Sequence, residues 1–429
     1  MTAVQNPNDT SLAVIFKDPT GKTLNLTFYR HNDPRFRKFD VARLRPDGAI
    51  ISEYEYHPPQ KTSNGLPVST LAKEGIDKDK IENTVETIMV GNKVARPGFL
   101  LIARNGNLVL EEYFHGVEPN RLWHQYSISK SITSLLAGIA EKQGKIDLSA
   151  SINPYFPDYE SSTWMTSEGG AAGVMPRVLL RMGNVLGWGD GHRDKRYSGN
   201  QESIYEETGW IDNTFGQTVV SNAPGPYFNY NTNLINLVGF TLQRATGMHL
   251  SEYLQQALLT PLGEPRSYFD SYAAVYGGKS NKDAPVLAGS TVLMRPMAMV
   301  KIGQLLLNKG QWNGKQIVPE DWIIEATSVK SLIFNVDRFA YGYGWVITKS
   351  ETEKGRAIWS ILGSGIGGQF IYVVPRYNLV VAMGATDFEL NNVSFFDFFR
   401  EQFLPAIDDK CEFERVYIDA KDFGKQTIK

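Results

Sequence analysis

Apolar residues recur at two different spacings along the chain. Two apolar runs, 99–103 and 108–114, flank Asn105-Gly106, a pair that tolerates positive φ and is the strongest short signal for a β-hairpin. From 127 to 142 the apolar residues recur instead every three or four positions and stop at Gly144, which predicts a helix. The sequence therefore predicts a strand pair followed by a buried helix.

The last third of the chain repeats both patterns. Residues 296–307 are apolar at helical spacing, and three apolar runs at 357–362, 370–374 and 379–383 are joined by short turns that contain glycine or proline. A closing helix is predicted at 394–403. The core therefore begins and ends with antiparallel strands, and helices lie between and after them.

The middle of the chain, from about 155 to 291, lacks strand signals. Helical pieces at 178–182, 233–246 and 251–259 are separated by long polar, glycine-rich loops. We therefore expect an α/β fold of the α+β type, in which an antiparallel sheet is flanked by helices and carries a mainly helical insertion.

These patterns predict three parts. Residues 1–95 form an N-terminal extension with short strands, residues 96–155 and 292–429 form an α/β lobe, and residues 156–291 form a mainly helical lobe. A length of 429 residues agrees with two lobes or one large domain with insertions, because it exceeds what one ordinary core holds.

Composition excludes several classes of protein. Hydrophobic residues make up 42% and charged residues 21%, as in an ordinary globular protein, and a formal net charge of −2 predicts no binding to nucleic acid or to membrane surfaces. The single cysteine, Cys411, rules out an internal disulfide framework and a thiolate metal cluster. The six histidines are scattered and form no close ligand pair. We therefore expect neither a metal nor an organic cofactor.

Targeting signals are not visible either. The first nine residues are polar, and the apolar run 12–16 is too short for the core of a signal peptide. The densest apolar run, 234–242, contains Asn236 and falls well short of the roughly 20 residues of a spanning helix. These features predict a cytoplasmic protein.

Ser127 and Lys130 form the one S-x-x-K motif of the chain. Because Ser127 opens the predicted helix, Lys130 lies one turn on and on the same face, where its amine can reach the serine hydroxyl. A serine hydroxyl needs such a partner to become a nucleophile at neutral pH. The alternative is that Ser127 merely caps the helix and Lys130 is solvated.

Two further clusters could carry chemistry. Tyr230 precedes a predicted helix and is followed by small polar residues, which could place a phenol in a cleft; the alternative is a capped helix start with Tyr230 in the core. The glycine-rich stretch 362–369 could let a substrate carbonyl approach backbone N–H groups. Its alternative is a tight hairpin or a bulge.

Together, these three clusters stand in an order and spacing that resembles the serine β-lactamase-like superfamily, which holds class C β-lactamases, DD-peptidases and family VIII esterases. The sequence is most similar to the 6-aminohexanoate-dimer (nylon-oligomer) hydrolase branch. The resemblance runs from about 97 to 405 and includes the flanking segments 106–116 and 341–345. It implies an antiparallel sheet flanked by helices with a helical insertion.

The resemblance also implies the roles of individual residues. Ser127 would be the acylated nucleophile, Lys130 its proton acceptor and Tyr230 the general acid and base for the leaving group. The sequence leaves open which of Lys130 and Tyr230 takes the serine proton. Backbone N–H groups of Ser127 and Ile366 would form the oxyanion hole. Residues expected to contact the substrate are Tyr126, Thr232, Ser364 and Gly365. The composition of the loop 187–194 adds Trp188 to them, and the alternative for this segment is an ordinary surface loop.

Two departures from the class C β-lactamase motifs narrow the range of substrates that we expect. Thr232 stands where class C β-lactamases have the asparagine of Tyr-x-Asn, and Gly363-Ser364-Gly365 stands in place of their Lys-Thr-Gly. The lysine that would attract a substrate carboxylate is missing, and the nylon-hydrolase and esterase branches relax both motifs. The prediction is therefore a serine hydrolase for a small amide or ester. Acyl transfer on the same scaffold, or a catalytically inactive binding protein, remain the alternatives, and a homodimer is possible.

Overall fold

A computed structural model describes most of the chain outside the N-terminal region. Of the first 53 residues it describes only the backbone of five short strands, and for 392–395 only the helical backbone. Side chains are described for 54–62, 65–89, 94, 96–159, 174–183, 211, 214–215, 228–265, 267–269, 286–333, 338–351, 357–388 and 396–408.

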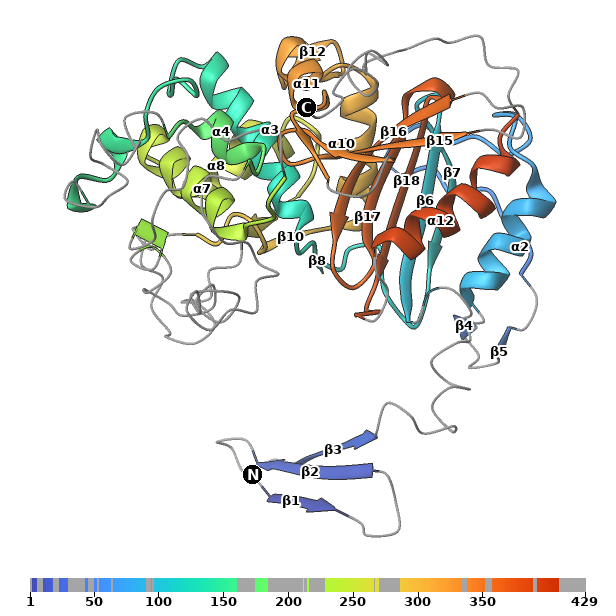
Figure 1. Cartoon of the computed structure of the whole chain (residues 1–429). Coiled ribbons are helices and arrows are strands. Elements are labelled where there is room, and N and C mark those ends of the chain that lie inside the picture. The colour runs from blue at the N-terminus through green and yellow to red at the C-terminus, as the bar shows by residue number, and fades with distance from the viewer. Residues whose placement is uncertain are drawn as a thin grey trace.

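The centre of the fold is an antiparallel sheet of eight strands (Figure 1). Its order is β13-β14-β15-β16-β17-β18-β6-β7, so the early hairpin β6–β7 pairs with the last strand of the sheet, β18. This confirms the antiparallel sheet expected from the sequence. The strands are β6 (Pro97–Arg104), β7 (Asn107–Tyr113), β13 (Ser331–Leu332), β14 (Phe339–Tyr341), β15 (Val346–Glu351), β16 (Ala357–Gly365), β17 (Gln369–Val374) and β18 (Leu379–Ala385).

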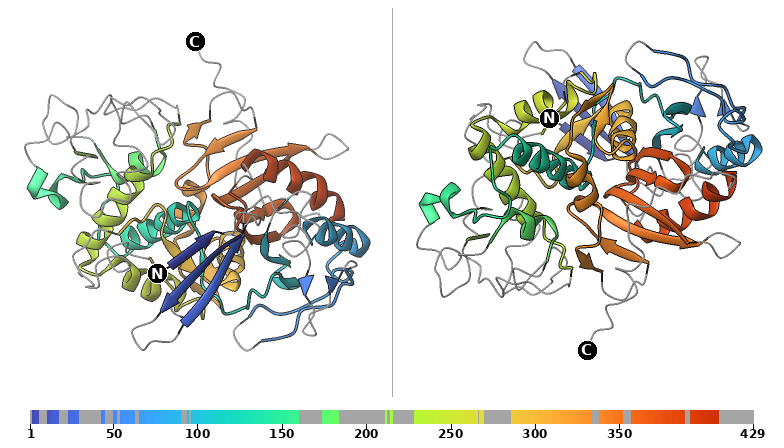
Figure 2. Two further views of the ribbon diagram at one scale, coloured as in Figure 1. Left: turned by 90° about the horizontal axis from the view of Figure 1, so that it is seen from below. Right: turned by 90° about the horizontal axis from the view of Figure 1, so that it is seen from above.

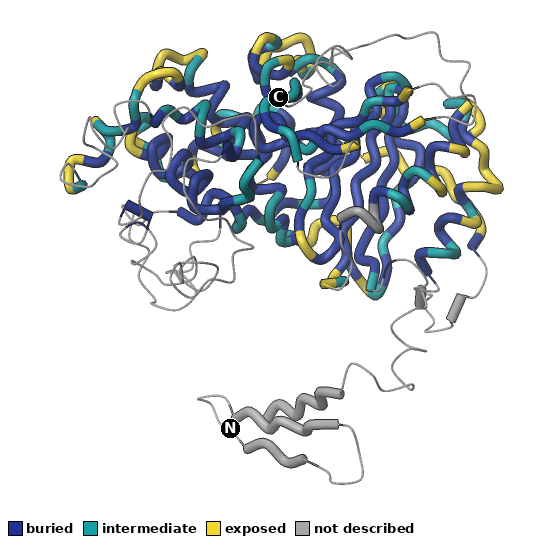
Figure 3. Tube along the Cα trace, in the orientation of Figure 1, coloured by how far each residue is buried: buried dark blue, intermediate teal, exposed yellow. Residues whose placement is uncertain are grey.

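Both faces of the sheet are buried, which explains why its central strands are continuously apolar. Successive side chains of a strand point to opposite faces. On β6, Leu101 belongs to one hydrophobic core, whereas Leu100 and Ile102 belong to the other. Ile371 and Tyr372 divide in the same way on β17. Figure 3 shows these central strands buried along their length.

Helices cover both faces. α3 (Ile128–Lys142) and α10 (Pro296–Leu307) pack on one face, against β16–β18 and β6. On the other side, α2 (Lys78–Met89) and α12 (Asn392–Gln402) pack against each other, and buried side chains of both belong to the second core. Figure 2 shows the two pairs on opposite sides of the sheet. α3 is buried from Ile128 to Ala140, because the sheet lies on one side and other helices on the other.

The described part of the middle region is mainly helical and packs on α3. α7 (Thr232–Thr246) lies against α3 and α4, and its N-cap, Asn231, accepts a hydrogen bond from the Asn233 N–H. Gly247 ends α7 at φ 68°. The remaining elements are η1 (Asn153–Tyr155), η2 (Pro157–Tyr159), α4 (Pro176–Leu180), α8 (Leu250–Leu254), the π-helix η5 (Gln255–Leu259), α11 (Glu320–Ala326), η6 (Pro375–Tyr377) and η7 (Leu404–Ala406), with the small strands β8 (Trp123–His124), β9 (Tyr268–Phe269), β10 (Val292–Met294), β11 (Gln311–Trp312) and β12 (Lys315–Gln316).

The N-terminal extension differs in part from its prediction. Short strands are present: β1 (Thr2–Gln5), β2 (Ser11–Lys17) and β3 (Thr23–Tyr29) form an antiparallel sheet, and β4 (Arg43–Leu44) pairs with β5 (Ile50–Ile51). However, residues 78–89 form α2, which the expectation of short strands alone does not include. Its buried residues Ile81, Val85 and Ile88 follow helical spacing and seal the second face of the sheet. Among the described residues, no helix has the length and apolarity needed to cross a bilayer.

Candidate active site

Ser127 occupies the N-cap of α3, but its side chain does not cap the helix. The Ser127 Oγ instead accepts a 2.9 Å hydrogen bond from Lys130 Nζ and lies 2.5 Å from the hydroxyl oxygen of Tyr230. The alternative in which Ser127 is a capping residue is therefore wrong. One turn of α3 brings the lysine to the serine, as the S-x-x-K spacing predicts.

Lys130 is buried, with 1% of its surface exposed, so the alternative of a solvated lysine is also wrong. Its Nζ donates a second hydrogen bond, of 2.7 Å, to the carbonyl oxygen of Gly289 and lies 4.8 Å from the centre of the Tyr230 ring. Among the described residues it has no ion-pair partner. The lysine is thus held by neutral oxygens and a ring face, with its amine directed at the serine.

Tyr230 sits one residue before the N-cap of α7, which fixes its backbone. The preceding turn is held by the Phe228 N–H, which donates to Leu332 O, and the Asn229 N–H, which donates to Met182 O. The ring of Phe228 packs 4.7 Å from that of Tyr341, whose pKa burial raises well above its usual value. Tyr230 is half-buried, so it is neither a core residue nor a freely exposed one.

The glycine-rich stretch forms the turn between β16 and β17, so the hairpin alternative describes its backbone correctly. Gly365 lies so close to the segment before α3 that a Cβ there would stand 2.4 Å from Gln125 O. Gly367 and Gly368 adopt φ values of +86° and +88°, which other residues rarely tolerate. The Gln369 side chain ties the turn to β18 by donating to Ala385 O at 2.7 Å. The turn therefore lies beside the residues that precede Ser127, with Ile366 at its start.

Tyr126, directly before Ser127, has a φ of +46°, an unusual value for a bulky residue. Its backbone N–H donates to His124 Nδ1 at 3.1 Å, and its ring packs 4.1 Å from the His124 ring. Burial lowers the pKa of His124, which favours the neutral ring that accepts this hydrogen bond. Local strain of this kind is typical of functional sites.

The other expected contact residues lie around this centre. Thr232 is buried at the start of α7, and its γ-methyl group would be 2.8 Å from a Cβ at Gly289. Ser364 is half-buried, and its Oγ, although buried, has no hydrogen-bond partner among the described residues. A Cβ at Gly363 would meet the Trp345 ring at 3.1 Å, so this tryptophan fills the space beside the position where class C enzymes carry lysine. Trp188 and the loop 187–194 lie outside the described residues.

Two contributors to the site were missed from the sequence. Gly289 supplies the carbonyl that holds Lys130, and its N–H donates to Asn236 Oδ1 at 2.9 Å. Asn236 is fully buried on α7. The one available signal was an asparagine inside the densest apolar run of the chain, since a buried polar side chain needs a partner.

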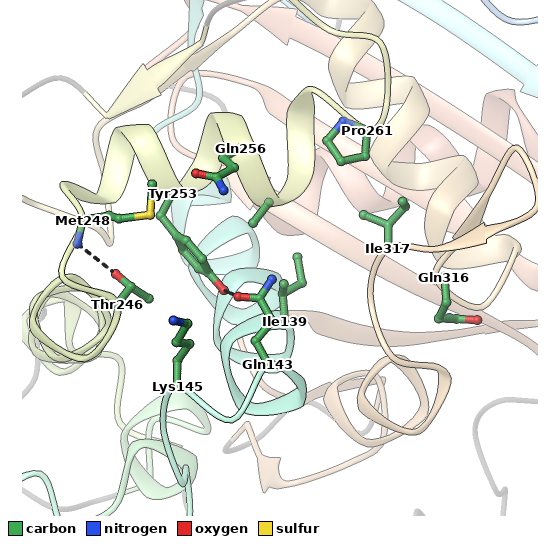
Figure 4. Close-up of a pocket in the computed structure, with 11 residues that line it drawn as sticks. Ile139, Gln143, Lys145, Thr246, Met248, Tyr253, Gln256, Pro261, Gln316 and Ile317 are labelled. Carbon is green, nitrogen blue, oxygen red and sulfur yellow. Dashed lines mark hydrogen bonds between the residues drawn. The ribbon is translucent and has the colours of Figure 1, made fainter.

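A separate pocket lies at the other end of α3 (Figure 4). It has a volume of about 360 Å³ and includes Ile139, Gln143 and Tyr253 in its lining. The hydrogen bonds drawn there join Tyr253 to Gln143 and the Met248 N–H to Thr246, and neither links a nucleophile to a base. Within the part of the chain that the structure describes, no group of three or more His, Cys, Asp or Glu side chains could hold a metal ion.

Comparison with known proteins agrees with the fold. The chain is 21% identical over 298 residues, 66% of its length and 70% of the relative's, to a 6-aminohexanoate-dimer hydrolase of Paenarthrobacter ureafaciens. A class C β-lactamase mutant superposes with a TM-score of 0.57 at 15% identity, covering 82% of this chain and 100% of the other. A family VIII carboxylesterase gives 0.55 at 18% identity, covering 77% and 98%. The beta-lactamase family model matches residues 81–399, so the chain belongs to this family of hydrolases.

Proposed function

We propose that this protein is a serine hydrolase that cleaves a small amide or ester through an acyl-enzyme on Ser127. One observation carries the proposal: the Ser127 Oγ contacts both Lys130 Nζ and the Tyr230 hydroxyl, at 2.9 and 2.5 Å. A nucleophile within hydrogen-bond reach of two proton-transfer groups is the arrangement that covalent acyl transfer needs.

In the proposed acylation step, the Ser127 Oγ forms a bond to the carbonyl carbon of the substrate and its proton passes to Nζ of Lys130, the proposed base. The electron pair of the carbonyl π bond moves to the oxygen, which the N–H groups of Ser127 and Ile366 then stabilise. The N-terminus of α3 adds a favourable partial positive charge at the same place. Removing one such donor typically costs about 10²–10³ in rate.

The tetrahedral intermediate then collapses. The carbonyl re-forms, the bond to the leaving amine or alcohol breaks, and the Tyr230 hydroxyl gives its proton to that group. Lys130 returns the serine proton to Tyr230, so both residues regain their starting state and the acyl group remains on Ser127. In deacylation, a water molecule loses a proton to Lys130 and Tyr230, and its oxygen bonds to the acyl carbon. The bond from that carbon to the Ser127 Oγ then breaks, the two residues return the proton to the Oγ, and the carboxylic acid leaves.

The absence of a lysine at position 363 supports a substrate without a carboxylate at that side. Gly363 stands in its place and Trp345 occupies the neighbouring space, so a long cationic side chain would not fit there without rearrangement. An uncharged amide or ester needs no such clamp. This favours the amidase and esterase activities over cleavage of the carboxylate-bearing β-lactams.

A fluorophosphonate probe tests the proposal, because such probes phosphonylate only activated serines. The wild type is expected to be labelled and Ser127→Ala is not. Ser149→Ala removes an exposed serine outside the site and serves as the matched control, expected to label like the wild type. Failure to label the folded wild type, or equal labelling of Ser127→Ala, would overturn the proposal.

A further inference from the structure

Large apolar side chains are rarely exposed in the described part of this molecule. Three stand out: Ile366, Phe388 and Ile324, with 54%, 53% and 40% of their surfaces exposed. Ile324 lies on α11, whereas the other two lie beside the candidate active site. Single exposed apolar residues are ordinary, but two neighbouring ones at the mouth of a site indicate a contact surface.

Contacts tie Phe388 to the turn that begins with Ile366. The ring of Phe388 meets the ring of Tyr126 edge-on, with centres 5.7 Å apart at 90°. A Cβ built on Gly367 would lie 3.2 Å from Phe388 Cε1, so the ring packs over the turn backbone. The N–H of Asp387 donates to Gly367 O at 3.1 Å and anchors the segment. Phe388 is therefore placed by contacts although half of it faces solvent.

We propose that Ile366 and Phe388 form a subsite for the acyl group of the substrate, and that the preferred acyl group is an uncharged alkyl chain or aryl group. The proposal rests on the proposed serine hydrolase function. The Ile366 N–H is the proposed donor to the acyl carbonyl oxygen, so its exposed side chain lies next to the bound acyl carbonyl. Tyr230, which would serve the leaving group, contacts Ser127 from the turn that precedes α7.

The chemistry of these side chains selects for apolar groups. Covering exposed Ile366 and Phe388 surface removes apolar area from water on both partners, which stabilises the complex in proportion to that area. An aromatic ring also offers edge and face contacts to an aryl group. A charged acyl chain would lose hydration against these side chains and gain no counter-ion from them.

The experiment compares p-nitrophenyl acetate, butyrate and hexanoate, which share one leaving group and differ only in the acyl chain. For the wild type we expect kcat/KM to rise with chain length. A fully buried methylene is worth about fourfold, but the four methylenes that hexanoate adds would be only partly covered on this exposed surface. At somewhat under twofold each, they raise the hexanoate-to-acetate ratio to about 10. Phe388→Ala and, separately, Ile366→Ala, which keeps the backbone N–H, are each expected to lower that ratio about three- to tenfold.

Ile324→Ala is the matched control, because it shortens another exposed isoleucine that lies on α11 and not in the proposed subsite. It is expected to leave the wild-type ratio unchanged. A flat chain-length series in an active wild type, or equal ratios in Ile324→Ala and both subsite variants, would overturn the subsite. If the wild type shows no turnover that depends on Ser127, the result counts against the proposed function instead. Failure of the subsite and failure of the proposed function are therefore distinguishable.

Discussion

Asn236 is linked to Lys130 through the backbone of Gly289. The Lys130 Nζ donates to Gly289 O at 2.7 Å, and the Gly289 N–H donates to Asn236 Oδ1 at 2.9 Å. Asn236 Nδ2 in turn donates to Asn233 Oδ1 at 3.2 Å. Because α7 also follows Tyr230 directly, one helix places both groups that contact the nucleophile. We interpret Asn236 as a positioning residue that acts through Gly289.

Replacing Asn236 by leucine should slow acylation about tenfold. The substitution leaves the buried N–H of Gly289 without its acceptor, which typically costs about 1–3 kcal/mol and lets the carbonyl that holds Lys130 move. We expect kcat to fall, KM to change little and the pH dependence of kcat to shift, as measured with a soluble ester across pH 5–10.

Thr241→Val is the control for the Asn236 variant. It removes another buried hydrogen bond of α7, from Thr241 Oγ1 to Leu237 O at 2.7 Å, outside the Lys130 network. A purely structural role for Asn236 would make both variants lose stability with no change in the pH dependence of kcat, which would contradict the interpretation.

Tyr230→Phe should discriminate between leaving groups. A p-nitrophenolate can leave without a proton, whereas an alkyl amine must be protonated before it leaves. Loss of the Tyr230 hydroxyl should therefore slow amide cleavage far more than cleavage of a nitrophenyl ester. We expect a difference of about 10² or more between the two losses in kcat/KM, measured on substrates with one acyl group. Equal losses on both substrates would show that Tyr230 does not protonate the leaving group.

His124 should make the nucleophile sensitive to acid. Burial lowers the pKa of His124. Below about pH 6.5 the unfolded chain therefore binds a proton that the folded chain does not bind. As the pH decreases, the free energy of unfolding decreases until the pH reaches the pKa of the folded state. Protonation in the folded state also removes the Nδ1 acceptor of the Tyr126 N–H. His124→Asn, which keeps an acceptor but does not titrate, should reduce the loss of acylation rate between pH 7.5 and 5.5.

His249→Asn is the matched control for this prediction. His249 Nδ1 likewise accepts a backbone N–H, from Ser251 at 3.3 Å, and burial lowers its pKa too, but it caps α8 outside the site. Urea unfolding should show reduced acid sensitivity of stability in both variants. Stopped-flow acylation should show a changed acid limb only in His124→Asn; the same change in both would contradict a local role for His124.

Elements with strong local signals could be predicted from the sequence. The turn at Asn105-Gly106 has φ values of 54° and 80°, the positive values that this pair favours. α3 and α7 follow their apolar periodicity closely, because both are buried against neighbours for most of their length. The S-x-x-K spacing placed Lys130 beside Ser127 for the same local reason: one helical turn joins them.

Features that depend on tertiary contacts could not be predicted in the same way. Gly289 acts through its backbone carbonyl, which has no residue-specific pattern, and its place beside Lys130 comes from an element more than 150 residues away. Phe388 is distinguished by exposure beside the β16–β17 turn, which only the folded chain shows. The expectation of an extension with short strands does not include α2, although the buried residues of this helix follow helical spacing.

Intact-protein mass spectrometry tests the central claim most directly. Wild type, Ser127→Ala and Ser149→Ala are mixed briefly with a panel of activated esters and linear amides, and the mass of each protein is measured after acid quenching. We predict that the wild type and Ser149→Ala gain the mass of one acyl group, and that Ser127→Ala gains none. Turnover without any adduct, or an adduct of equal yield on Ser127→Ala, would contradict an acyl-enzyme on Ser127.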